Sequence, residues 1–187
     1  MNVARIGTAS QGVSAAERSY QGASAYARDR LAMRSISGIK NPDGPADAII
    51  EHPDVRRMLL TQRAIAEGGR AMVTYASQFA DVYRAGKTEE AKKTAEARLG
   101  FCTPILKGFI TELGVEAANH GVQVFGGHGY IKEWGMEQIL RDSRIATLYE
   151  GTTGIQALDL VGRKVLLDRL KQLNVFTGEM LSFAKGC

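Results

Sequence analysis

Cysteine, proline and long apolar runs are scarce in this sequence. Its 187 residues include only two cysteines, Cys102 and Cys187, which are too few for a disulfide framework. Neither lies near a group of histidines, so no metal site is expected. No apolar run approaches the roughly 20 residues that a membrane-spanning helix needs. These absences favour a cytoplasmic protein without a membrane span.

An excess of charge of one sign is also missing. The chain has 24 lysines and arginines against 20 aspartates and glutamates, a formal net charge of +4. The basic residues are spread among acids and form no dense stripe with interleaved aromatic residues, as a nucleic-acid-binding face would. We therefore expect no nucleic-acid partner and little salt-dependent binding to duplex DNA.

Helical periodicity dominates the sequence. Apolar residues recur at intervals of three and four, the spacing of a helix with one buried face. Residues 35–51 and 121–135 lack this spacing and predict a loop and a glycine-rich turn. No segment alternates with period two, so the predicted fold is all-α, an antiparallel, up-down four-helix bundle. The expected helices cover residues 3–34, 53–85, 88–117 with a kink at Pro104, 136–144, and 155–170 with Leu158, Val161, Val165 and Leu166 facing inward.

The glycine-rich turn is the first candidate for a ligand-binding segment. Gly126, Gly127 and Gly129 would let the backbone come close to an anionic group and present N–H donors to it. The spacing matches neither a Walker loop nor a dinucleotide fingerprint. The same glycines would also suit a tightly packed turn that ends a helix, and both interpretations stay open.

Glu150 is the second candidate. It stands between Tyr149 and Gly151, just before a helix that Thr152 or Thr153 can cap. A carboxylate shielded by apolar neighbours suits a general base, because its charged form is disfavoured. An acid at this place would equally stabilise the dipole of the following helix. The catalytic interpretation requires the carboxylate to lie on the same side of the bundle as the glycine turn.

Several motifs occur together in one order: Phe-Gly-Gly-His-Gly-Tyr at 125–130, Leu-Arg-Asp at 140–142 and Leu-Tyr-Glu-Gly-Thr at 148–152. With Tyr-Ala-Arg-Asp-Arg at 26–30 upstream, the chain closely resembles the C-terminal helical domain of the acyl-CoA dehydrogenases, flavoenzymes that oxidise acyl-CoA thioesters. The resemblance implies a bundle domain over residues 1–170 and a C-terminal extension over 171–187. The family's N-terminal helical and middle β domains are absent from this sequence, so the isolated piece is not expected to turn over.

The resemblance implies roles for residues on the substrate side. Glu150 matches the catalytic base that removes the proton α to the thioester carbonyl, while a β-hydride passes to the flavin. Tyr149 and Gly151 match positions that line the acyl site. Arg5 matches an arginine near the bound CoA thioester.

The resemblance also implies FAD as cofactor and assigns residues to it. Arg30 looks like the residue that meets the FAD pyrophosphate, which its bidentate donors suit. Gln123, Gly126 and Gly127 match a segment that contacts the FAD of a neighbouring subunit, which implies a homo-oligomer. Thr152 matches a flavin contact beside the base. The implied partners are an acyl-CoA substrate and an electron-transfer flavoprotein or a similar acceptor.

Some positions depart from the family pattern. Leu-Ala-Met-Arg at 31–34 replaces the usual Lys-Thr-Phe-Gly, Pro53 replaces a glutamine, and Gly154 stands where a glutamine that touches FAD is common. In having Pro53 and the long loop over 35–51, the chain resembles the subgroup that includes the 3-methylmercaptopropionyl-CoA dehydrogenases. Two alternatives remain: a non-catalytic oligomerisation module, and an acyl-CoA dehydrogenase-like protein associated with DNA.

Overall fold

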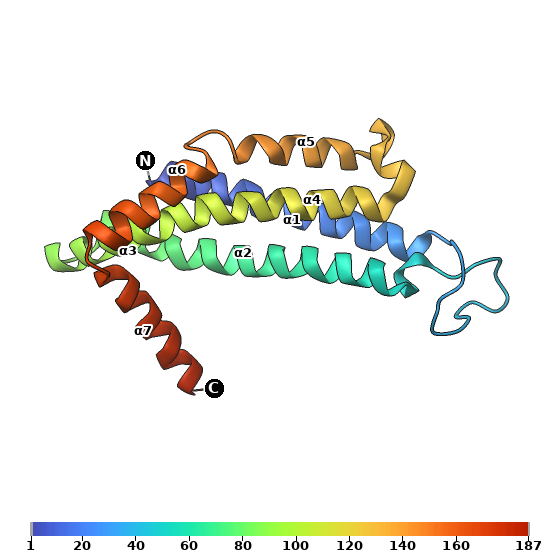
Figure 1. Ribbon diagram of the computed structural model, residues 1–187, viewed down its shortest axis with the longest axis horizontal. Coiled ribbons are helices and arrows are strands. Elements are labelled where there is room, and N and C mark those ends of the chain that lie inside the picture. Colours follow the sequence, from blue (N-terminus) through green and yellow to red (C-terminus); the bar gives the residue numbers. More distant parts are fainter. Residues whose placement is uncertain (1, 187) are drawn as a thin grey trace.

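The computed structural model describes residues 2–186, and every regular element in this range is helical (Figure 1). The prediction of an all-α fold is confirmed. Over the same residues, no helix combines the length and apolar character needed to cross a bilayer. The helices are α1 (Asn2–Asp29), α2 (Pro53–Ala85), α3 (Glu89–Ile105), α4 (Thr111–Phe125), α5 (Met136–Ala146), α6 (Thr153–Leu158) and α7 (Lys171–Gly186), with π-helical segments over Leu106–Ile110 and Asp159–Leu167 and 3-10 turns over Ile49–Glu51, Gly126–Tyr130 and Lys132–Trp134.

The bundle consists of α1, α2, the rod formed by α3 and α4, and α5. Along the chain, each runs in the direction opposite to the one before (Figure 1). The π-helical segment Leu106–Ile110 joins α3 to α4 without a loop. It follows directly after Pro104, where the sequence predicts a kink, because proline has no N–H to donate within the helix.

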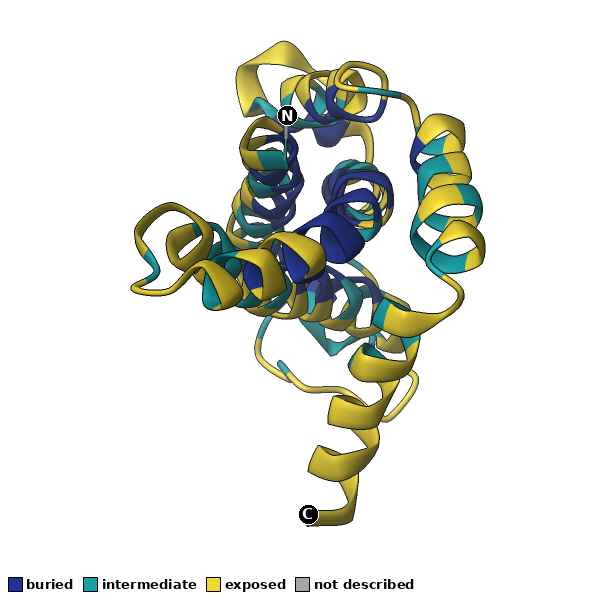
Figure 2. Ribbon diagram, turned by 90° about the vertical axis from the view of Figure 1, so that its left-hand side faces the viewer, coloured by how far each residue is buried: buried dark blue, intermediate teal, exposed yellow. Residues whose placement is uncertain are grey.

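The closest approach in the bundle is between α1 and the α3–α4 rod. A Cβ atom on Gly12 would lie 2.6 Å from the carbonyl oxygen of Ile110, and one on Gly114 would lie 2.8 Å from the Cα atom of Gly12. The two backbones can come this close because neither glycine has a side chain. Small residues fill much of the surrounding core, and the buried faces of the helices point toward one another (Figure 2). Fully buried alanines here are Ala9, Ala16, Ala117 and Ala118.

Three predicted helix ends are confirmed. Helix α2 begins at Pro53, in the first turn where a missing N–H costs nothing, and ends before Gly86. Helix α3 is capped by Thr88, whose Oγ1 accepts a hydrogen bond of 3.2 Å from the N–H of Ala91. These ends follow from local chemistry, which the sequence displays directly.

The first helix is shorter than its periodicity predicts. Helix α1 ends at Asp29, not near Arg34, because the next residues pair with a distant part of the chain. Leu31 forms an antiparallel bridge with Ala48, and the N–H of Ala32 donates to the carbonyl of Asp47 over 3.0 Å. The periodicity cannot reveal this competing pairing.

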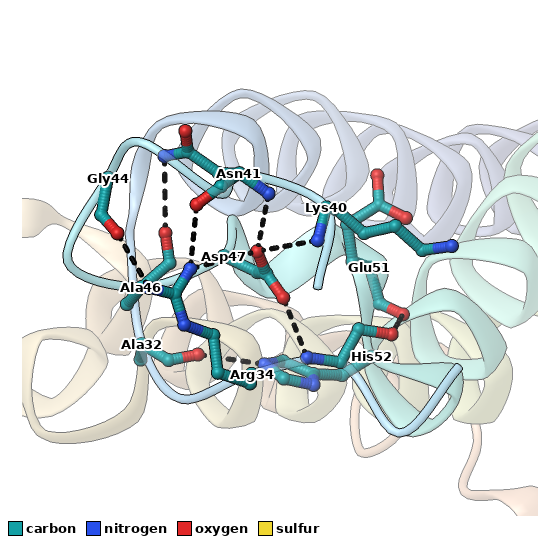
Figure 3. A network of polar contacts seen from close by, with 10 residues as sticks. Ala32, Arg34, Lys40, Asn41, Gly44, Ala46, Asp47, Glu51 and His52 are labelled. Carbon is teal, nitrogen blue, oxygen red and sulfur yellow. Dashed lines mark hydrogen bonds and ion pairs between the residues drawn. The ribbon is translucent and has the colours of Figure 1, made fainter. Parts of the chain in front are cut away.

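Asp47 organises the loop between α1 and α2 (Figure 3). Its carboxylate is completely buried and accepts hydrogen bonds from the backbone N–H groups of Ser35, Lys40 and Asn41, at 2.8, 2.9 and 2.7 Å. Arg34 forms an ion pair with the same carboxylate at 3.4 Å. These bonds, led by that from Ser35, lower the pKa of Asp47 to about 2. The predicted loop is therefore ordered around one buried charge.

The C-terminal region differs most from the prediction. Helix α6 and the π-helical segment Asp159–Leu167 cover most of the expected last helix, but Leu158, Val161 and Leu166 are exposed. The predicted inward orientation was wrong for these three. Val161 and Leu166 lie in the π-helical segment, where the wider turn changes which side chains share a face, whereas Leu158 is the last residue of α6. The chain turns at Arg169, whose φ is 53°, and continues as α7.

Helix α7 falls within the expected extension at 171–187, for which the sequence predicts no helix. It projects away from the bundle (Figure 1). Leu173 and Phe176 still pack against the core near Phe101, and Glu179 accepts a hydrogen bond from Arg98. The extension is thus attached to the bundle by its first turns.

Candidate functional site: the bend before helix α6

Glu150 lies on the bend that joins α5 to α6. Its φ is 57° and that of Gly151 is 91°, so two consecutive residues adopt the left-handed conformation. The sequence correctly places Glu150 on a bend ahead of a helix. The predicted apolar shielding was wrong for the described residues, since Glu150 is exposed. Its carboxylate is free to meet a group that approaches from outside the bundle.

The side chain of Gln156 forms hydrogen bonds with the backbone of the bend. The Nε2 atom of this buried glutamine donates to the carbonyl oxygens of Glu150 and Gly151, over 3.1 and 3.2 Å. Tyr149 donates its hydroxyl proton to Gln11 on α1. Gln156 therefore ties the bend to α6, and Tyr149 ties it to α1.

Thr152 and Thr153 begin helix α6, although neither acts as expected. Thr152 occupies the N-cap position but its side chain makes no capping hydrogen bond. Thr153 donates from Oγ1 to Glu112 on α4 over 2.6 Å. The exposed hydroxyl of Thr152 is consequently available beside Glu150.

Basic side chains lie beneath the bend. Arg5, on the first turns of α1, is 8% exposed and pairs with Asp159 at 3.3 Å. Lys107, in the π-helical segment, is completely buried, and its Nζ atom has no partner among residues 2–186. Burial lowers the pKa of Lys107, and the charge of Arg5 lowers it further, while Glu112 and Glu150 act in the opposite direction. Lys107 therefore lies within electrostatic range of both Arg5 and Glu150.

The glycine turn lies at the other end of the bundle, where α4 ends and α5 begins (Figure 1). Gln123 is exposed on the last turn of α4, which extends past the predicted start of the turn at 121. Gly126, Gly127 and Arg30 line one cavity of about 380 Å³. Within residues 2–186, the exposed guanidinium of Arg30 has no hydrogen-bond or ion-pair partner.

The glycines of this turn have different roles. A Cβ atom on Gly129 would lie 2.4 Å from the carbonyl oxygen of Val122, so this glycine is required by packing. Gly126 has a φ of 59°, and nothing lies within 4 Å of a Cβ placed on Gly126 or Gly127. The packed-turn interpretation therefore holds for Gly129, whereas Gly126 and Gly127 face open space that an external group can enter.

Aromatic side chains support the turn. Tyr26 stacks on Phe125 with ring centroids 4.1 Å apart and forms a hydrogen bond of 2.8 Å with Nδ1 of His128. Trp134 stacks on His128 at 4.9 Å. His128 thus serves in the packing of the turn, as expected of a loop residue.

The structure separates the predicted site residues into two groups. Glu150 and Arg5 belong to one end of the bundle, and Arg30 and Gly126 to the other (Figure 1). The 25 residues of α1 from Arg5 to Asp29, the residue before Arg30, span about 36 Å at 1.5 Å rise per residue. The required placement of Glu150 and the glycine turn on the same side of the bundle is not found within one chain. The two therefore form no common site in this chain, and a catalytic role for Glu150 requires that the glycine turn serve a different copy.

Comparison with known proteins identifies the domain. Residues 1–166 match the family described as acyl-CoA dehydrogenase, C-terminal domain. The chain belongs to the acyl-CoA dehydrogenase family. It is 47% identical over 186 residues to the 3-methylmercaptopropionyl-CoA dehydrogenase of Ruegeria pomeroyi, covering 100% of this chain and 31% of that protein. A butyryl-CoA dehydrogenase of Syntrophomonas wolfei is 32% identical over 98% of this chain and 30% of its own length. This acyl-CoA dehydrogenase domain spans about a third of the length of these relatives.

Solved structures agree on the fold of the domain. The crystal structure of Caenorhabditis elegans ACDH-11 in complex with C11-CoA superimposes with a TM-score of 0.72 at 23% identity, over 86% of this chain and 24% of that one. Butyryl-CoA dehydrogenase from Megasphaera elsdenii gives a TM-score of 0.66 at 24% identity, over 86% of this chain and 36% of its own. The helical arrangement is therefore that of acyl-CoA dehydrogenases.

Sequence reasoning missed three polar residues of the acyl-CoA dehydrogenase domain. Gln156 lies four residues after the motif at 148–152 and carries no expected role, and Gln11 lies within the helical pattern of α1. Lys107 was the one detectable signal, because a lysine flanked by Ile105, Leu106 and Phe109 interrupts an apolar stretch.

Proposed function

We propose that the chain is the helical domain of an FAD-dependent enzyme that oxidises an acyl-CoA thioester to the 2,3-enoyl-CoA. The named activities of the relatives, among them 3-methylmercaptopropionyl-CoA and butyryl-CoA dehydrogenases, support this class of reaction. The exposed position of Glu150 on a bend with a fixed backbone carries the proposal. A general base must be reachable by its substrate and yet be held in place.

Glu150 would take the proton from the carbon α to the thioester carbonyl, so that its carboxylate becomes a carboxylic acid. FAD, when bound, supplies the acceptor for the hydride that leaves the β carbon. Loss of one proton and one hydride leaves a double bond between the two carbons and balances the reaction. Glu150 alone is too weak a base for such a proton, so the thioester must be polarised by neighbouring donors.

Three residues on the same end would position the substrate. Among residues 2–186 the Nε atom of Arg5 has no partner, and its Nη1 atom donates to Asp159, which fixes the orientation of the side chain. Tyr149 is 38% exposed and presents its ring beside the base. Gly151 removes a side chain next to Glu150 and leaves room for an acyl group. We propose that these residues line the acyl site.

The residues assigned to FAD fit such a group. Within residues 2–186, the guanidinium of Arg30 and the hydroxyl of Thr152 make no hydrogen bond, and the guanidinium is suited to a pyrophosphate. Gly126 and Gly127 offer open backbone. Because Thr152 and Arg30 lie at opposite ends of the bundle, they would serve two different FAD molecules. Arg30, Gly126 and Gly127, together with Gln123, would then reach the cofactor of a neighbouring copy, which makes the enzyme a homo-oligomer.

The remaining partners follow from this chemistry. An enzyme that stores two electrons on FAD needs an acceptor, and we propose an electron-transfer flavoprotein or a similar protein. An acyl-CoA substrate is a soluble metabolite, which favours a cytoplasmic location.

The test uses the full-length parent protein, purified with its flavin. We expect a yellow protein that reduces an electron acceptor in the presence of acyl-CoA. Glu150→Gln removes the base without changing size, so the variant should keep FAD and lose turnover. Glu96→Gln, on the exposed face of α3, is the matched control and should keep both. An active Glu150→Gln variant would refute the assignment of the base.

A second candidate function is assembly alone. Apolar side chains that would normally be covered are exposed on the segment after α6, including Leu158, Leu166 and Leu167. If the chain serves only to associate, Leu167→Glu should dissociate the oligomer in analytical ultracentrifugation, while the full-length protein should hold no flavin.

A further inference from the structure

Gln156 has contacts that the proposed reaction does not by itself require. It is 1% exposed, and its amide nitrogen is shared between two consecutive carbonyl oxygens, those of Glu150 and Gly151. Both acceptors demand an NH2 group, so the orientation of the amide is determined. A single buried side chain therefore holds two consecutive backbone carbonyl groups, the first of which belongs to the candidate base.

The bend needs such a support. Glu150 is a non-glycine residue in the left-handed region, with a φ of 57°, and the next residue follows at 91°. A left-handed conformation persists in a residue with a Cβ atom only where the surroundings fix it. No other side chain in residues 2–186 donates to the carbonyls of Glu150 and Gly151. The position of the carboxylate thus depends on Gln156.

Gln156 is itself firmly seated. A Cβ atom on Gly108 would lie 3.3 Å from Cβ of Gln156, so the rod passes close against it. Within residues 2–186, its Oε1 atom is buried without a hydrogen-bond partner. Rotation of the amide is prevented by this packing.

We propose that Gln156 is a positioning residue that holds Glu150 in the orientation from which it takes the substrate proton. The proposal rests on the function proposed above. Gln156 does not touch the substrate. It acts through two hydrogen bonds to the backbone of the bend, and loss of these bonds should reduce the chemical step and leave binding intact.

The experiment compares two buried glutamines in the full-length, FAD-loaded protein. Gln156→Met keeps the length of the side chain but removes both hydrogen bonds. We expect kcat to fall about 10- to 100-fold, the cost of misplacing a reacting group, with KM within about threefold of wild type and FAD content unchanged. Gln62→Met is the matched control, because Gln62 is also fully buried and bonded, to Ser19 and the carbonyl of Met58, but lies away from the bend. Its kcat should stay within about twofold of wild type.

A second variant disturbs the same contact from the opposite side. A Cβ atom on Gly151 would lie 2.6 Å from Nε2 of Gln156, and residues with a Cβ atom rarely adopt the φ of 91° found here, so Gly151→Ala should displace the amide and lower kcat. Because Gly151 also lines the proposed acyl site, only kcat is used from this variant. If Gln156→Met does not bind FAD, the kcat of Gly151→Ala tests the positioning role of Gln156. Wild-type kcat in Gly151→Ala, or an equal loss of kcat in Gln156→Met and Gln62→Met, overturns the inference.

Glu150→Gln, measured in parallel, distinguishes failure of the positioning role from failure of the proposed base. If that variant is inactive while Gln156→Met and Gly151→Ala keep wild-type kcat, only the positioning role is refuted. If Glu150→Gln itself turns over normally, the proposed function fails.

Discussion

The contact between Gly12 and the α3–α4 rod allows a quantitative prediction about stability. Gly12→Ala would place a methyl group 2.6 Å from the carbonyl oxygen of Ile110 and 3.2 Å from Cα of Thr111. Both atoms belong to the backbone of a packed helix and cannot move aside as a flexible side chain would. The substitution must therefore push α1 away from the rod.

The expected magnitude follows from a matched pair. Overpacking a core costs about 1 to 3 kcal/mol, and replacing glycine by alanine inside a helix gains about 1 kcal/mol. Gly7→Ala, on the same helix, gains the propensity term alone, since nothing lies within 4 Å of its Cβ position. The difference between the two variants cancels propensity and leaves the overpacking cost of about 1 to 3 kcal/mol, with Gly12→Ala the less stable.

Thermal and urea unfolding, followed by circular dichroism, measure this difference. For a domain of this size, about 2 to 4 °C in Tm corresponds to each kcal/mol. Gly12→Ala should melt several degrees below Gly7→Ala, and Gly7→Ala should melt at or above wild type. Equal melting temperatures for the two variants would refute the close backbone contact between α1 and the rod.

Three further predictions concern other parts of the domain. Hydrogen bonds from the loop backbone lower the pKa of Asp47 to about 2, below the ordinary value of an aspartate, so its contribution to stability is present above about pH 4 and is lost as the pH falls to about 2; acid titration of Tm should show this loss in wild type and not in Asp47→Asn. Removing the cap with Thr88→Ala should cost about 1 kcal/mol in urea unfolding, and Thr88→Ser should keep most of it. Burial raises the pKa of Cys102 to about 11, so iodoacetamide should modify it slowly at pH 8 in the folded protein and rapidly in urea, as peptide mass spectrometry would reveal; rapid labelling without urea would contradict its buried position.

Much of the fold follows from local patterns in the sequence. The interval of three and four predicts the α2 helix over 53–85, and Pro53 and Thr88 mark helix starts by chemistry that acts within one turn. The end of α1 was mispredicted because Leu31 pairs with Ala48, and no local signal records a partner 17 residues away. The inward face predicted for Val161 and Leu166 failed because both lie in the π-helical segment, whose turns do not follow the 3.6-residue period.

The sequence predicted on which segment the site residues lie better than it predicted their contacts and burial. Glu150 and Gly151 were placed on a bend by the residue types around them. Their left-handed backbone and the two hydrogen bonds from Gln156 are tertiary facts, which depend on how α6 packs on the rod. The separation of Glu150 from the glycine turn likewise depends on the length and direction of α5, which joins them.

The proposed base is tested most directly in a single turnover. The full-length, FAD-loaded protein is mixed with excess acyl-CoA without oxygen, and the yellow absorbance of the flavin is followed. Wild type should bleach within the mixing experiment as the α proton and β hydride leave the substrate. Glu150→Gln should bind acyl-CoA and stay yellow, and bleaching of this variant at the wild-type rate would contradict the proposal that Glu150 removes the proton.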